Sequence, residues 1–395
     1  MVDFVLYEGV MFRGVWSRLP AILSLLVLSF TVDVTTQSSR AEELQAGITR
    51  SEVTLDFRTV AVSVPELPVG GATFRTVVPT EAGTPSELVR VARLDVYAAT
   101  AIGTVELAGA LVSVSRYDLW LAGTGINAAD DGWSLVVASA LGRVASAPAD
   151  VVGTLRLAHR TRDVISSTLT GGIVAAGNDG GRLMLSWGRH EWTTGVRFTI
   201  RSQSPRARRP SGGGDDRTFD FTPTDLQRIV RLGSRNTVSV TLPDGSRVAT
   251  VYPKNLNVED RDFAQLVSVA TDAVVRVTAG AVIRLDTDIP LEFGDVTLET
   301  GNVGLPDSPG AYGVWLKRVA DGWRLVFNDE PDAWGTQHDP VFDVAEVRLD
   351  YSQARAPDDS FRAMSASVVM TTAERGQFVL VWGPHEWTAD FTVAR

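Results

Sequence analysis

The sequence of 395 residues contains no cysteine, so disulfide bonds, thiolate metal ligands and cysteine nucleophiles are all excluded. It also lacks an excess of positive charge, because its net charge is −10. This charge argues against a nucleic acid partner and against electrostatic docking on anionic lipid, both of which need clustered lysine and arginine. The remaining partners to consider are a small molecule, a glycan or another protein.

Familiar enzyme motifs are missing as well. The chain has no Gly-x-Ser-x-Gly elbow, no phosphate-binding loop followed by lysine and serine or threonine, and no His-Glu-x-x-His metal motif. The run of glycines at residues 212–214 follows no predicted strand and opens no predicted helix. We therefore predict no catalytic residue, no metal site and no cofactor.

The amino-terminal segment has the pattern of an export signal. Arg13 and Arg18 precede an apolar run at residues 21–32, and a polar stretch at residues 35–41 follows. The apolar run is short for a membrane span, so we predict a signal peptide within residues 1–41, with Met1 or Met11 as the start. A secreted or periplasmic location follows. The alternative is an uncleaved membrane anchor, which would be the chain's only contact with a membrane.

The rest of the chain has the pattern of an all-β protein. Apolar and polar residues alternate at residues 53–57, 60–64 and 105–114, as in half-buried strands. Asp-Gly pairs separate apolar runs at residues 117–122 and 133–137 and at residues 312–317 and 323–327, which predicts hairpins. Helical periodicity is limited to short segments at residues 85–91 and 224–231. Many short strands with tight turns predict antiparallel sandwiches.

A repeated cassette gives the organisation. Residues 187–193 read Trp-Gly-Arg-His-Glu-Trp-Thr and residues 382–388 read Trp-Gly-Pro-His-Glu-Trp-Thr, at an offset of 382 − 187 = 195. A Tyr-x-x-Trp-Leu motif at residues 117–121 returns at residues 312–316, with 312 − 117 = 195. Two motifs with one offset predict an internal duplication that yields two antiparallel β-sandwich domains.

The boundary between the predicted domains lies in residues 202–217. This stretch holds Arg206, Arg208 and Arg209 between two prolines, and then three glycines. Such a composition cannot bury apolar surface, so we predict a flexible linker. The expected domains are a degenerate β-sandwich repeat at residues 48–201 and a second β-sandwich at residues 218–395.

The second half resembles a known family. The residues that carry the resemblance are Gly-Ala-Tyr-Gly-Val-Trp-Leu at 310–316, Trp-Gly-Thr-Gln-His-Asp-Pro at 334–340 and the closing Leu-Val-Trp-Gly at 380–383. Together they are similar to the bacterial domain-of-unknown-function 2911 family, over residues 302–393. The resemblance implies an exported β-sandwich and no particular activity. The family's upstream Trp-Arg-x-Gly-Ala-Asn-like run has no counterpart at residues 266–277, and the first half lacks the 334–340 loop.

Two groups of residues could carry chemistry. His190 and His385 occupy equivalent cassette positions, followed by Glu191 and Glu386, and a His-Glu pair could bind a metal or transfer protons. Adjacent residues of a strand point to opposite faces, however, so we expect these cassettes to be structural corners with their tryptophans in the core.

The richer polar segment is residues 329–339, which only the second half contains. We predict ligand binding there by Trp334, His338, Asp339 and Asp332, because an aromatic ring, an imidazole and carboxylates combine on one loop. The expected function is an exported, non-catalytic module that binds a small molecule, a glycan or an envelope protein. The alternatives are a secreted hydrolase that uses this loop, with carbohydrate as one candidate substrate, and an acidic loop with only a structural role.

Overall fold

A computed structural model describes residues 47–55, 58–78, 88–98, 104–107, 110–113, 116–123, 132–140, 148, 150–177, 180–197, 235–254, 256–277, 282–302, 308–333, 335–353 and 363–394. The predicted signal peptide and the predicted linker lie outside these residues. Within them, strands dominate and every strand pairing is antiparallel. The all-β prediction is therefore confirmed.

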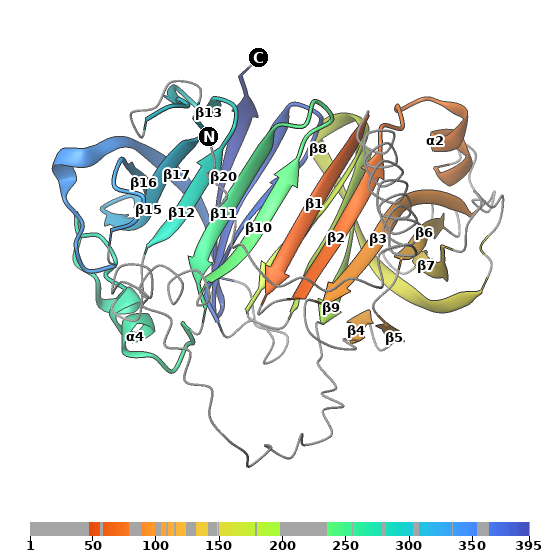
Figure 1. The fold of residues 1–395 in the computed structure, drawn as a ribbon, viewed down its shortest axis with the longest axis horizontal. Helices are drawn as coiled ribbons and strands as arrows, with labels where there is room; N and C mark the ends of the chain where they lie inside the picture. Colours follow the sequence, from red (N-terminus) through yellow and green to blue (C-terminus); the bar gives the residue numbers. More distant parts are fainter. Residues whose placement is uncertain are drawn as a thin grey trace, which may run out of the picture. The chain divides into compact units, whose positions relative to one another are not determined.

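Twelve of the described strands pair successively into one long sheet, which runs across Figure 1. Their order in space is β8 (Val151–Ala176), β7 (Trp133–Ser139), β6 (Arg116–Gly123), β3 (Val89–Ala98), β2 (Arg58–Pro65), β1 (Ile48–Leu55), β10 (Arg235–Thr241), β11 (Arg247–Pro253), β12 (Ile283–Thr287), β15 (Gly310–Val319), β16 (Gly322–Asn328) and β17 (Asp343–Gln353).

A second layer packs behind the middle strands of this sheet, and β8 and β17 continue into it from the two ends (Figure 1). On the β8 side it contains β9 (Gly180–Arg197), β4 (Thr104–Leu107) and β5 (Ala110–Ser113). On the β17 side it contains β20 (His385–Val393), β19 (Arg375–Trp382), β18 (Ser365–Met370), β13 (Leu291–Phe293) and β14 (Val296–Leu298).

Alternating side chains explain why these segments form strands around a core. Trp133, Leu135 and Val137 of β7 are buried, whereas the residues between them are partly exposed. The same period of two runs through β12, where Ile283 and Leu285 point inward. One main apolar core includes residues of both halves of the chain.

The described part of the chain also contains three short helices: α2 (Ala72–Val77), α4 (Arg261–Ser268) and the 3₁₀ helix η1 (Pro340–Phe342). The sequence pattern did not predict them. Part of the helical segment predicted at residues 85–91 is instead the start of β3, and the other predicted helical segment lies outside the described residues. The segment predicted as a single strand at residues 105–114 instead contributes to two strands, β4 and β5, which pair with each other.

The two halves of the chain pass through the same order of elements. The first half runs β1, β2, α2, β3, β4, β5, β6, β7, β8, β9, and the second runs β10, β11, α4, β12, β13, β14, β15, β16, β17, β18, β19, β20. The number of strands differs between the halves because β8 corresponds to β17 and β18 together, and β9 corresponds to β19 and β20 together. Gly180 lies against Val196 and Arg197, so β9 doubles back on itself as β19 and β20 do.

The halves are joined rather than separate, which differs from the expected pair of independent sandwiches. Backbone pairing of β1 with β10 makes the long sheet continuous across the middle. A small buried apolar cluster also combines residues of both halves. Its members are Val174, Met184, Val369, Val379 and Val381. The predicted division at residues 202–217 lies outside the described residues and stays a prediction.

Hydroxyl groups complete this junction. The Ala175 amide donates to Ser367 Oγ at 2.9 Å, and Ser365 Oγ donates to the Ala175 carbonyl at 2.7 Å. Thr170 Oγ1 donates to the Thr371 carbonyl at 3.3 Å. The backbone at the meeting edges of β8 and β18 is therefore satisfied by side chains instead of a strand ladder.

The first prediction concerns this junction. Trypsin should cleave the full chain near Arg206 to Arg209, because the sequence there is basic and rich in glycine. The two fragments should nevertheless elute together in size-exclusion chromatography, since they share a ladder and a buried cluster. Fragments that separate and remain folded would contradict the shared junction. A chain that resists cleavage there would contradict the linker.

The second prediction concerns the cassette tryptophans. Trp187 and Trp382 are 0% and 1% exposed, which confirms that both belong to the core. Replacing either by alanine should lower the free energy of unfolding by roughly 3–5 kcal/mol, as measured by urea denaturation. Val341→Ala, at a residue that is 82% exposed, is the control and should change stability by less than about 0.5 kcal/mol. A small effect of either tryptophan change would show that its site is not rigidly packed.

Candidate functional site

The predicted site residues lie in the connection from β16 to β17. The structure describes Asp332, His338 and Asp339, whereas Trp334 lies outside the described residues. Asp332 is exposed, with 63% of its side chain accessible to solvent. Its carboxylate lies 3.5 Å from Arg284 Nη1 and 3.9 Å from Arg235 Nη1. Asp332 therefore faces a pair of guanidinium groups on the outer side of the long sheet.

His338 and Asp339 serve the loop itself. His338 Nε2 lies 2.8 Å from Asp343 Oδ1, and its ring meets the ring of Trp315 edge-on at 5.0 Å. Asp339 Oδ1 accepts from the Val341 amide at 3.0 Å at the start of η1. The two side chains thus anchor the loop. Ligand binding by these residues remains a hypothesis.

Other polar groups of this loop accept hydrogen bonds from asparagine side chains. Asn302 Nδ2 donates to Asp329 Oδ1 at 2.9 Å, and Asn328 Nδ2 donates to the Asp339 carbonyl at 2.9 Å. Among the described residues, no group of three or more potential ligands could hold a metal ion. What the loop offers chemically is an exposed carboxylate beside two arginines.

The two cassettes build aromatic clusters at equivalent places. The first aromatic cluster consists of Phe74, Trp133, His159, Trp187, His190 and Trp192. The second consists of Phe263, Trp323, Tyr351, Trp382, His385 and Trp387. Each contains a helix phenylalanine edge-on to the first cassette tryptophan, and a cassette histidine stacked on the second tryptophan.

Glycine at the cassette turn lets the helix approach. Gly188 and Gly383 have φ of +62° and +57°, which disfavours other residues. A Cβ added to Gly383 would lie 2.5 Å from Val258 Cγ1 and 3.1 Å from Phe263 Cζ. The glycine of the Trp-Gly pair therefore lets α4 and the residues before it cover the turn.

The polar centres of the clusters differ. In the first cluster His159 Nε2 lies 3.0 Å from His190 Nδ1, whereas in the second Tyr351 Oη lies 2.8 Å from His385 Nδ1. The centroids of the two imidazole rings lie 5.2 Å apart. This distance is about the N···N distance plus the radius of each ring, so the two nitrogens lie between the centroids and point at each other. This is hydrogen-bond geometry and not that of two ligands converging on a metal.

Glutamate and histidine of each cassette point to opposite faces, as the strand geometry predicts. Glu191 is 1% exposed and forms ion pairs with Arg160 and with Arg162. Glu386 lies 3.5 Å from Arg182 of the other half. The cassettes therefore contain no His-Glu site, and the interpretation as structural corners is supported.

Burial controls protonation of the cassette histidines. Burial first, and the neighbouring His159 second, lower the pKa of His190 to about 4. Burial also lowers the pKa of His385. Both imidazoles are thus held neutral at pH 7, so each ring keeps a nitrogen that can accept a hydrogen bond from its partner, His159 or Tyr351.

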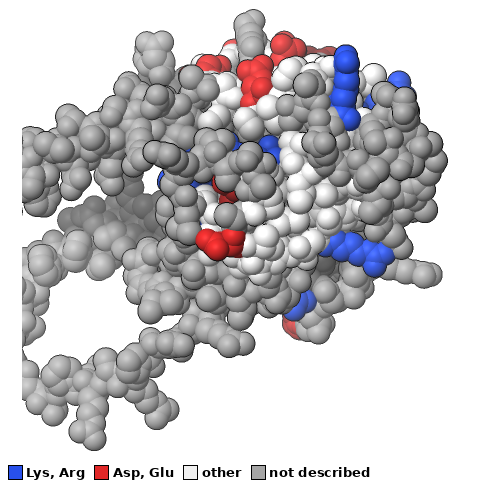
Figure 2. All heavy atoms as spheres, turned by 90° about the vertical axis from the view of Figure 1, so that its right-hand side faces the viewer, with Lys and Arg blue, Asp and Glu red and all other residues white. Residues whose placement is uncertain are grey.

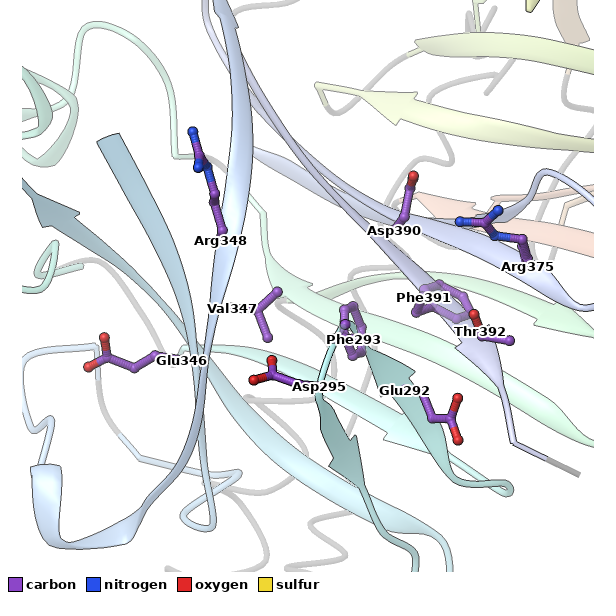
Figure 3. Close-up of a pocket in the computed structure, with 11 residues that line it drawn as sticks. Glu292, Phe293, Asp295, Glu346, Val347, Arg348, Arg375, Asp390, Phe391 and Thr392 are labelled. Atoms are coloured by element: carbon purple, nitrogen blue, oxygen red, sulfur yellow. The ribbon is translucent and has the colours of Figure 1, made fainter. Parts of the chain in front are cut away.

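A cleft that the sequence did not predict lies elsewhere in the second half (Figure 3). Its volume is about 410 Å³. Three walls form it: the β13–β14 turn, the strand β17 and the strand β20, with Arg375 at one rim. The lining residues are Glu292, Phe293, Gly294, Asp295, Glu346, Val347, Arg348, Arg375, Asp390, Phe391 and Thr392.

The floor of this cleft is apolar, and the side chains around the floor are charged. Phe293 and Phe391 are buried beneath it, and their rings lie 5.5 Å apart. Four carboxylates and two guanidinium groups surround this floor and are exposed. These residues come from segments about a hundred positions apart, and only the Gly-Asp turn at residues 294–295 was visible as a sequence signal.

A second, apolar hollow beside Trp315 and Trp382 has a volume of about 30 Å³, too small for an organic ligand.

On the outer side of the first half, each of two aspartates meets two arginines. Asp95 pairs with Arg50 and Arg116, and Asp118 lies near Arg90 and Arg93. Acidic and basic side chains are interspersed on the face shown in Figure 2, so its described part presents no field of one sign.

The third prediction concerns pH. His190 has a lower pKa in the folded chain than its ordinary value of 6.5, so the unfolded state binds more protons between about pH 6.5 and 4. The stability that the neutral ring provides is complete above pH 6.5 and is lost as the pH falls towards 4. Urea unfolding at several pH values should show a steeper loss for the wild type than for His190→Gln. Parallel pH profiles would contradict a buried neutral imidazole.

Comparisons with known proteins add no relative. No family model matches the chain, and neither the curated proteins nor the solved structures yielded a significant match. The resemblance to the domain-of-unknown-function 2911 family therefore stays a prediction, and the cleft and the clusters must be interpreted from their own geometry.

Proposed function

We propose that this chain is an exported, non-catalytic binding protein whose ligand occupies the cleft between β13–β14, β17 and β20. The observation that carries the proposal is the cleft itself. Its volume of about 410 Å³ falls in the range of small-ligand sites, roughly 300–1,000 Å³. An apolar floor with charged groups around it can fix the orientation of a polar ligand. The expected ligand remains a small molecule, a glycan or a segment of an envelope protein.

The composition of the cleft supports binding rather than catalysis. Its described lining contains no histidine, serine, lysine or tyrosine, so a serine or lysine nucleophile with a histidine base has no support there. The alternative of a hydrolase that uses residues 329–339 has less support. Asp329 and Asp339 accept hydrogen bonds within the loop scaffold, and His338 is paired with Asp343.

We also propose that the two halves arose by internal duplication. The common order of elements supports this origin, as do the two aromatic clusters with matching contacts. A further repeat, Arg-Leu-Asp at residues 93–95 and 284–286, lies on equivalent strands, β3 and β12. The family resemblance of residues 302–393 would then apply to a protein in which two related halves share one sheet.

Export rests on the sequence of residues 1–41 alone. None of the helices in the described ranges is long and apolar enough to cross a membrane. The predicted signal peptide would deliver the chain to the periplasm or the medium. There a cysteine-free fold depends on no disulfide for its stability.

The fourth prediction tests the cleft. Defined sets of short peptides, oligosaccharides and fatty acids should include a ligand that raises the melting temperature of the full chain. Val347→Trp, on the cleft wall, should abolish that rise by filling the space. Val344→Trp is the matched control, because Val344 lies on the same strand, is 46% exposed and does not line the cleft.

Two outcomes would contradict the proposal. One is a set of ligands of which none raises the melting temperature. The other is a rise that survives Val347→Trp but is lost in the double variant Trp334→Ala and His338→Ala, which would place the site in the 329–339 loop.

A further inference from the structure

The main chain of β20 faces the cleft at one residue. Hydrogen bonds at the end of the strand fix the direction of its backbone groups. Val393 donates its amide to the Glu374 carbonyl on the β19 side, and Ala394 donates to the Pro290 carbonyl on the β13 side. Backbone groups alternate along a strand, so even-numbered residues of β20 face away from β19. The amide and carbonyl of Asp390 therefore point to the side on which the cleft lies.

On that side, neighbouring strands pair with β20 before and after Asp390 in the sequence, but not at Asp390 itself. β17 pairs with β20 from His385 to Thr388, and β13 pairs with it at Thr392 and Val393. Among the described strands, none pairs with residues 389–391 on this side. The gap arises because β17 turns away to join β16 in the long sheet. The cleft thus holds a short, uncovered strand edge with one donor and one acceptor.

The surroundings of this edge carry both signs of charge. Arg348 and Arg375 extend towards one side of the cleft in Figure 3, whereas Asp295 and Glu292 lie on the other. Glu346 stands on the wall opposite β20. The Asp390 side chain accepts a hydrogen bond from Gln377 Nε2 at 2.9 Å, so it is held beside its own strand.

Resting on the proposed function, we infer that the cleft binds an extended peptide segment with oppositely charged groups, whose main chain pairs with Asp390. The amide of the bound residue donates to the Asp390 carbonyl, and its carbonyl accepts from the Asp390 amide. This adds a short strand in the gap between β17 and β13. Three residues of strand span about 10 Å, which fits the gap of residues 389–391.

A peptide fits this site better than a sugar does. Pyranose rings are held by exposed aromatic faces, and Phe293 and Phe391 are each only 2% exposed. An edge that offers one amide and one carbonyl matches the donor and acceptor of a single amino acid residue. The exposed carboxylates and guanidinium groups complement an ionised amino group and carboxylate.

Four tripeptides, each acetylated at the amino terminus and amidated at the carboxyl terminus, are the probes: Lys-Gly-Asp, Asp-Gly-Lys, Lys-Gly-Lys and Asp-Gly-Asp. Binding to the full chain is followed by the amide resonances of residues 389–391. At least one of the first two peptides should bind more tightly than both of the others, because the walls carry both charges. Equal affinity for all four would overturn the charge-complementary part of the inference.

Two matched variants test the strand pairing. Asp390→Pro removes the amide that faces the cleft, and proline is tolerated where a strand edge is unpaired. Asp390→Ala keeps the amide and removes only the carboxylate. Asp390→Pro should weaken binding roughly three- to tenfold relative to Asp390→Ala, as loss of one hydrogen bond implies. Equal affinities of the two variants would overturn the pairing.

The same comparison can be made on the peptide. Methylation of the glycine nitrogen removes the donor to the Asp390 carbonyl without changing the protein. If Asp390→Pro fails to fold, the methylated peptide still tests the strand pairing. A methylated peptide that binds as tightly as its parent would overturn the inference. If no tripeptide shifts these resonances at millimolar concentration but an oligosaccharide gives a rise that depends on Val347, the binding function stands and the peptide is wrong. If nothing binds, both proposals fail.

Discussion

Buried strand edges must find hydrogen-bond partners, and this requirement shapes the whole chain. Two layers with many strands have several edges, and most of them are closed here by the next strand in space. Where β8 meets β18 no ladder forms, and Ser365 and Ser367 supply the missing donor and acceptor. Both serines are 0% exposed, so an alanine at either place would leave buried backbone groups unpaired. The continuous sheet in front and this hydroxyl seam behind join the halves into one body.

The same requirement makes an unpaired stretch of edge informative. β20 is flanked by β19 along its length, yet its other side is shared by β17 and β13 with a gap between them. The first half has a similar arrangement, in which β8 pairs with β9 up to Thr193 and β4 pairs with it at Val196 and Arg197. Comparison of the halves also shows where packing constrains the sequence and where it does not. The tryptophans and glycines of the cassettes are retained, whereas the hydrogen-bond partner of the cassette histidine is His159 in one half and Tyr351 in the other.

Much of the fold followed from local sequence patterns. Alternation and Asp-Gly turns predicted the β6–β7 and β15–β16 hairpins, and the cassette tryptophans were correctly assigned to the core. The helices were missed because six to eight residues give too few turns for a periodic pattern. Residues 329–339 attracted attention through composition, but His338 and Asp339 are largely engaged in fixing the loop. The cleft could not be foreseen, since Glu292, Arg348 and Asp390 meet only through pairings between distant strands.

The pairing of β1 with β10 has a consequence for how the chain acquires its fold. Thr54 pairs with Thr237, and 237 − 54 = 183 residues separate them. Closing so long a loop is entropically slow, so the contact order of the central ladder should make it a late event in folding. Until β10 is in place, β1 is an uncovered edge next to apolar side chains, which is a template for aggregation. A chain of this design would benefit from remaining unfolded, or bound to a chaperone, until synthesis of its second half is complete.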